Sequence, residues 1–145
     1  MPRSLRGIVR TVAAFDLALT ALLVWPGISI EILELLYRVN AFLGGDVTLP
    51  GFHAIPDLFV SLAGVLAAPW PVARLLAPRP LLAGLDVAGR LVVAALIAVA
   101  VVGGQAPALL FAFVATELLG AGWQVVALVG AEGPEGSPIG RPGGR

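Results

Sequence analysis

The stretch LLAGLDVAGRLVVAALIAVAVVGG, residues 81–104, constrains the fold more than any other segment. At about 1.5 Å of rise per residue, a helix of this length matches the roughly 30 Å hydrocarbon core of a bilayer. It carries Asp86 and Arg90 one helical turn apart, and therefore on one face. Because ionisable side chains are costly in lipid, other parts of the protein must cover that face. The stretch therefore predicts one helix of a membrane bundle.

The composition favours lipid as the solvent for most of the chain. Of 145 residues, 59% are hydrophobic and 12% are charged, and the mean hydropathy is +0.98; soluble domains carry about 25% charged residues. Nine acidic residues balance nine basic ones, so the net charge gives no reason to expect nucleic acid as a partner. With no cysteine and one histidine, the chain lacks thiolate ligands and a multi-histidine metal site. We expect no metal and no cofactor.

Four apolar helices are expected along the chain. The first is interpreted as a membrane helix rather than a cleaved signal peptide, because Asp16 interrupts it and no clean cleavage site follows. It ends at Pro26-Gly27, and residues 28–43 then predict an amphipathic helix that lies along the membrane surface or caps the bundle. The four spans cover approximately residues 8–25, 52–71, 81–104 and 108–129, with a short continuation of the second towards Pro78.

These elements predict an all-α fold, an antiparallel four-helix transmembrane bundle with a short amphipathic helix after the first span. Residues 1–130 are expected to form one domain, and the Gly- and Pro-rich residues 131–145 a disordered cytoplasmic tail. Arginines precede the first span, follow the fourth, and include Arg74 and Arg79 between the second and third; the other two connections are acidic or uncharged. The positive-inside rule therefore predicts a multi-pass protein of the inner (plasma) membrane with both termini in the cytoplasm.

Counting residues along each span, at about 1.5 Å per residue, places ionisable groups from three helices at similar depth. Asp16, Arg90 and Glu117 fall in one layer, and Asp86 lies one turn nearer the cytoplasm. One arginine facing three carboxyl groups requires the excess acid to be protonated or hydrogen-bonded. Two interpretations stay open: a structural polar core that joins the helices, or a site for a proton, an ion or a small polar head group.

Four further residues are candidates for contact with a substrate. Gln124 follows Glu117 by about two turns on nearly the same face, and its neighbour Trp123 either lines a cavity or, more simply, anchors the helix at the interface. His53 and Asp57 share a helix face near the outer boundary. They form an acid–base pair at the mouth of a site, or else Asp57 stabilises a helix start, which is the favoured interpretation.

In outline the chain resembles small DoxX-like bacterial membrane proteins. The matching features are Pro26-Gly27 after the first span, Gly89-Arg90 in the third, and Thr116-Glu117-Leu118 in the fourth. The resemblance implies a four-helix bundle. Some members of that group are linked to quinone-dependent oxidation and many have no known function, so the resemblance supports the bundle and does not assign an oxidoreductase activity.

The leading functional hypothesis is a membrane protein whose layer of Asp16, Asp86, Arg90 and Glu117 binds a small amphiphilic, lipophilic molecule. An enzyme of isomerase, cyclase or hydrolase type would use a protonated carboxyl group as acid, with Arg90 holding the opposite charge. Two alternatives stay open: a non-catalytic membrane subunit with a structural polar core, and a proton-coupled carrier that needs a dimer or a larger pore. The bilayer is the expected partner, and a second copy of the chain or a partner in a membrane complex is left open. A cavity reaching Glu117 favours the ligand hypothesis, and a closed, fully paired cluster favours the subunit.

Overall fold

The computed structural model describes residues 3–25, 27–49, 51 and 54–131, and this part of the chain contains helices and no β-strand. The elements are α1 (Arg3–Val24), α2 (Ile28–Phe42), α3 (Ala54–Ala67), α4 (Pro69–Leu76), α5 (Pro80–Val102), the short 3-10 helix η1 (Ala108–Leu110) and α6 (Phe111–Ala131). The expected tail lies outside the described residues, apart from its first residue, which ends α6.

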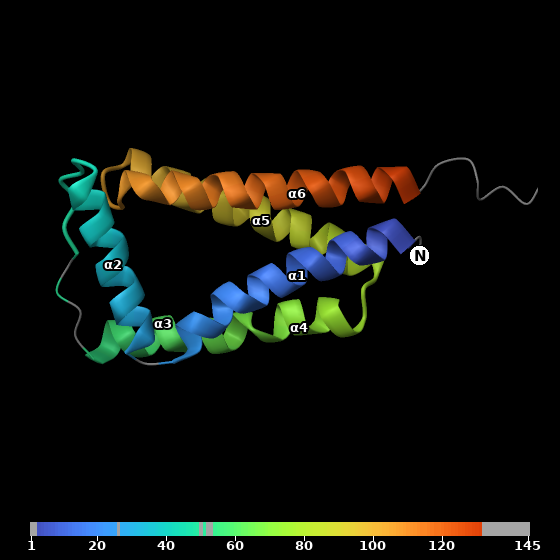
Figure 1. Ribbon diagram of the computed structural model, residues 1–145, viewed down its shortest axis with the longest axis horizontal. Helices are drawn as coiled ribbons and strands as arrows, with labels where there is room; N and C mark the ends of the chain where they lie inside the picture. Colours follow the sequence, from blue (N-terminus) through green and yellow to red (C-terminus); the bar gives the residue numbers. More distant parts are fainter. Residues whose placement is uncertain (1–2, 26, 50, 52–53, 132–145) are drawn as a thin grey trace, which may run out of the picture.

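Four segments of the described chain are long and apolar enough to cross a membrane: Ser4–Val24, Leu58–Leu76, Pro80–Val102 and Ala108–Gly130. Successive crossings run in opposite directions, and the start of α1 and the end of α6 lie at the same end of the bundle (Figure 1). Large apolar side chains such as Leu96, Val99 and Leu119 are exposed on its outer faces, where lipid rather than water is the compatible solvent. The prediction of an all-α, multi-pass membrane bundle is confirmed.

The second crossing consists of α3 and α4 together, so the short continuation expected after Pro69–Pro71 belongs to the crossing itself. The amide of Ala68 donates to the carbonyl of Gly64 over 2.9 Å, and that of Val72 to Ala68 over 3.4 Å, which carries helical bonding across the junction. Pro69 and Pro71 stand at the start of α4, where a missing N–H group costs least. The crossing therefore continues to Leu76, and it carries Arg74 into the bundle.

The helix α1 is the centre of the packing, since it contacts α2, α3, α4 and α6, while α5 packs along α6. Gly64 allows α3 to approach α1 closely. A Cβ atom there would lie 2.8 Å from the backbone carbon of Leu23 and 2.8 Å from the backbone nitrogen of Val24. Small residues commonly serve this purpose between membrane helices.

The amphipathic helix α2 lies across one end of the bundle, roughly perpendicular to the crossings, and reaches from the α1–α3 side to η1 (Figure 1). Gly27 starts it with a φ of 92°, a conformation that favours glycine. Glu34 and Arg38 form an exposed ion pair at 3.9 Å, and Phe42 is also exposed. The helix therefore caps one end of the bundle, which is one of the two placements that its pattern predicts.

Candidate functional site

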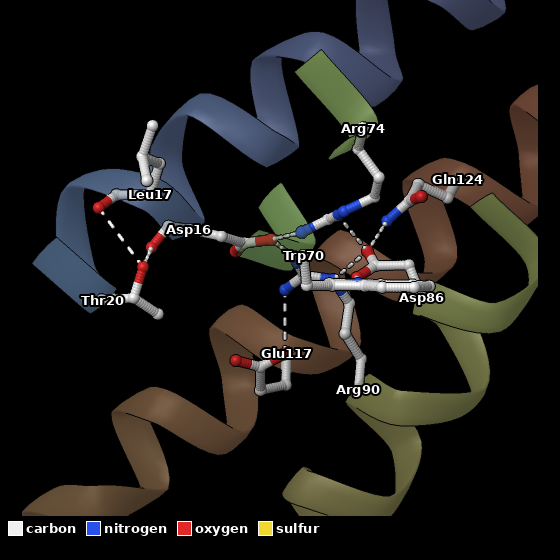
Figure 2. A network of polar contacts seen from close by, with 9 residues as sticks. All are labelled: Asp16, Leu17, Thr20, Trp70, Arg74, Asp86, Arg90, Glu117 and Gln124. Carbon is white, nitrogen blue, oxygen red and sulfur yellow. Dashed lines mark hydrogen bonds and ion pairs between the residues drawn. The ribbon is translucent and has the colours of Figure 1, made fainter. Parts of the chain in front are cut away.

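Ionisable side chains from four helices meet in the middle of the bundle (Figure 2). The structure brings together the four residues that counting along the spans placed at similar depth, and it adds a fifth. The cluster consists of Asp16 from α1, Arg74 from α4, Asp86 and Arg90 from α5, and Glu117 from α6. We call these five residues the charged cluster.

Arg90 joins the carboxyl groups of the charged cluster. Its Nε donates to Asp86 Oδ2 over 2.9 Å, its Nη1 donates to Glu117 Oε2 over 2.8 Å, and its Nη2 bonds to Asp16 Oδ2. The planar fork of the guanidinium group thus serves a different carboxyl group with each nitrogen. Gly120 leaves room for it, because a Cβ atom at that position would lie 3.0 Å from Arg90 Nη1.

Asp86 is the most heavily bonded acid of the charged cluster. Besides Arg90, it accepts from Gln124 Nε2 over 2.6 Å and from Trp70 Nε1 over 2.9 Å. Arg74 Nη1 lies 2.5 Å from the same carboxylate. Three hydrogen-bond donors and the Arg74 guanidinium, from three helices, therefore surround Asp86, and such an arrangement allows a carboxylate to be buried.

Arg74 and Trp70 belong to the polar network, although the sequence did not predict them there. Arg74 was counted among the cytoplasmic arginines, but its side chain is 1% exposed and its Nη2 lies 2.5 Å from Asp16 Oδ2. Trp70 bonds to Asp86, and its ring centroid lies 5.9 Å from the Arg74 guanidinium carbon. The Pro-Trp-Pro sequence could have indicated this placement, because prolines are tolerated in the first turn of a helix and α4 begins at Pro69.

The other candidates for substrate contact have different outcomes. Gln124 is buried and belongs to the polar network. Trp123 is 51% exposed and does not line the cavity described below. Asp57 lies on α3, with its side chain outside the description, and His53 lies outside the described residues. Within the part of the chain that the structure describes, no group of three His, Cys, Asp or Glu residues has the arrangement of a metal site.

A cavity of about 490 Å³ adjoins the charged cluster. Its polar end is formed by the charged cluster itself, beside Trp70. From there the cavity extends towards α2. This part is lined by apolar side chains from all four crossings, namely Leu19, Leu23, Ala67, Val93 and Phe113. The cavity is therefore charged at mid-depth in the bundle and apolar towards the α2 end.

Two of the three carboxyl groups are more exposed than Asp86 and the guanidinium groups. The side chains of Asp16 and Glu117 are 16% and 22% exposed, whereas Arg74 and Arg90 are buried. No family model, curated protein or solved structure matches the chain. The outline resemblance to DoxX-like proteins stays a prediction, and the geometry of the cavity is the basis for a functional proposal.

Proposed function

We propose that the protein binds a small amphiphilic molecule in this cavity, with the polar end of the molecule at Asp16 and Glu117. The observation that carries the proposal is the order of the lining, charged at mid-depth and apolar towards α2. The volume of about 490 Å³ falls within the range of small-molecule pockets, about 300–1,000 Å³. Buried ionisable groups in membrane spans commonly mark ligand or ion sites.

The composition of the charged cluster favours a ligand over a purely structural role. A structural cluster is most stable when each buried charge has an opposite partner. Here three carboxyl groups face two guanidinium groups, and Glu117 is both partly exposed and bonded through one oxygen to Arg90. The charged cluster also reaches a cavity rather than being closed on all sides. A cavity that reaches Glu117 was the feature expected of a ligand site, and a closed, fully paired cluster was the feature expected of a subunit with a polar core; these observations favour the ligand site.

We further propose that both termini lie in the cytoplasm and that α2 lies at the outer surface of the plasma membrane. Arg6, Arg10 and Arg79 are exposed at the end of the bundle opposite α2, while Glu31 and Asp46 are exposed at the α2 end. This distribution supports the positive-inside orientation even without the buried Arg74. On this orientation, the apolar part of the cavity extends towards the outer surface.

Acid–base conversion of the bound molecule is a second step of the proposal, and Glu117 is its best-placed acid–base group. Glu117 lines the cavity, and it lies beside Arg90, which can hold an opposite charge as the proton leaves. A reaction of isomerase, cyclase or hydrolase type needs no metal or thiol for this step. Loss of turnover in Glu117→Gln at saturating substrate, where weaker binding no longer limits the rate, is the result that would support catalysis.

Binding is tested by obstructing the cavity in protein reconstituted in nanodiscs of neutral phosphatidylcholine. Val93 lines the cavity, whereas its neighbour Val92 is exposed on the outer face and does not. Three probes share a naphthalene ring: 1-naphthylmethylamine, 1-naphthalenemethanol and 1-naphthoate. We expect at least one to bind saturably by calorimetry, to lose about tenfold or more in affinity in Val93→Trp, and to keep its affinity in Val92→Trp. Equal affinities in both variants for all three probes would exclude the cavity as a binding site.

A further inference from the structure

The charged cluster has one more acid than base. Asp16, Asp86 and Glu117 are opposed by Arg74 and Arg90, and the other described residues that line the cavity carry no charge. Asp86 is fully engaged by its donors, so the excess charge belongs to the pair Asp16 and Glu117. A buried net charge at mid-depth in a membrane requires a balancing cation, which is either a proton or part of a ligand.

The two signs of charge are arranged unequally around the cavity. The guanidinium nitrogens of Arg90 each point to a carboxyl oxygen, and Arg74 is 1% exposed, so its Nε, which has no hydrogen-bond acceptor among the described residues, is shielded. The more exposed side chains are those of Asp16 and Glu117. A molecule in the cavity therefore has better access to the side chains of Asp16 and Glu117 than to either guanidinium group, although both arginines also line the cavity.

We propose, as an extension of the proposed function on which it rests, that the ligand is a cation: an ammonium group on a small apolar body. Asp16 and Glu117 balance the ammonium charge, and the apolar body lies among Leu23, Val93 and Phe113. Phe113 adds a π face that is favourable for a cation or an aromatic ring. Because the charged cluster lies at mid-depth and not at head-group level, the ligand is a free small amine rather than the head group of a membrane lipid.

Proton and ligand then compete for one site. The charged and titratable groups at this site are Asp16 from α1, Arg74 from α4, Asp86 and Arg90 from α5, and Glu117 from α6. Without ligand, a proton on one carboxyl group of the charged cluster balances the excess charge; binding of an ammonium group releases that proton. Release of one proton makes the affinity for the amine rise up to about tenfold per pH unit while that carboxyl group is protonated.

The same three naphthalene probes test the charge of the ligand, since they differ mainly in the polar group. We expect 1-naphthylmethylamine to bind at least about tenfold more tightly than 1-naphthoate, with the neutral alcohol between them. Affinity for the amine should rise between about pH 5 and about pH 8, whereas affinity for the alcohol should not. Tightest binding by the carboxylate or the alcohol, still sensitive to Val93→Trp, overturns the cationic ligand and leaves the proposed function standing.

Substitutions distinguish the effect of the charged cluster on ligand affinity from the effect of the net charge of the protein. Glu117→Gln keeps an oxygen that accepts from Arg90 and makes the charged cluster neutral, so the preference for amine over alcohol should fall about tenfold. Glu31→Gln removes an equal charge from the exposed surface of α2 and should leave the preference unchanged. Asp16→Asn is the second variant and should reproduce Glu117→Gln. An amine preference that survives in both cluster variants contradicts the inference, and loss of cavity-dependent binding for every probe contradicts the proposed function as well.

Discussion

Arg90 donates from Nη1 to Glu117 Oε2 over 2.8 Å, and this bond joins α5 to α6 beside Gly120. Within the described chain, Arg90 is the hydrogen-bonding partner of Glu117, whereas Asp86 accepts from several donors. Two acids of one cluster therefore have different roles. Asp86 bonds to groups from α4, α5 and α6, whereas Glu117 contacts the charged cluster through one oxygen, which faces Arg90 in Figure 2, and lines the cavity.

This difference predicts opposite effects on stability for two substitutions that change the charge equally. Glu117→Gln keeps an acceptor for Arg90 and removes the excess charge, so the variant should unfold at the same temperature as the wild type or at a higher one. Asp86→Asn replaces an acceptor oxygen with an NH₂ group among several donors and should lower the free energy of unfolding by about 1–3 kcal/mol. Thermal unfolding in detergent micelles at one pH compares the two variants directly.

The two substitutions control for each other, because each removes one carboxylate from the charged cluster. If net charge alone governed stability, both variants would shift the unfolding temperature in the same direction and by similar amounts. A loss of stability in Glu117→Gln as large as that in Asp86→Asn would contradict separate roles for these acids.

Arg74 is predicted to be essential for folding although it follows two prolines near the end of a crossing. Arg74→Ala leaves Asp16 and Asp86 without a cation that now lies 2.5 Å from each. Removing one partner of a buried ion pair typically costs about 3–5 kcal/mol. Arg79→Ala is the matched control, because the Arg79 side chain is exposed at the residue that precedes α5. The unfolding temperature of this variant should differ little from that of the wild type. Equal unfolding temperatures of the two variants would mean that Arg74 stabilises the fold no more than an exposed arginine does, which would contradict the prediction.

The architecture and most of the site follow from simple features of the sequence. The length and composition of each apolar run set the crossings. Counting at a constant rise per residue was sufficient to bring Asp16, Arg90 and Glu117 together, because helices in a membrane are straight enough for sequence distance to measure depth.

The rest of the site depends on the junction between α3 and α4, which the composition does not reveal. Proline most often ends a helix, so the Pro69–Pro71 segment indicated the end of the crossing. In the structure Ala68 keeps helical bonding across the junction, and this places Trp70 and Arg74 inside the bundle. The presence of a cavity was also beyond prediction, since it depends on how four helix faces fit together.

The contact between α1 and α3 makes Gly64 sensitive to the smallest enlargement. In Gly64→Ala the new methyl group would lie 2.8 Å from backbone atoms of Leu23 and Val24, which are unable to move without shifting the helix. Overpacking of this kind costs about 1–3 kcal/mol. Gly84→Ala is the control, because no atom lies within 4 Å of its added Cβ. Thermal unfolding should show a clear loss for Gly64→Ala alone, and equal melting of the two variants would contradict close helix contact.

The orientation of the bundle can be tested without background, because the chain has no cysteine. Ser4 is exposed near the start of α1, and Thr48 is exposed after α2 at the opposite end. We expect a membrane-impermeant maleimide to label Thr48→Cys in intact cells and to label Ser4→Cys after permeabilisation only, because the arginine-rich end faces the cytoplasm. The reverse pattern would invert the orientation and place the apolar part of the cavity towards the cytoplasm. Labelling of both variants in intact cells would contradict the crossing of α1 itself.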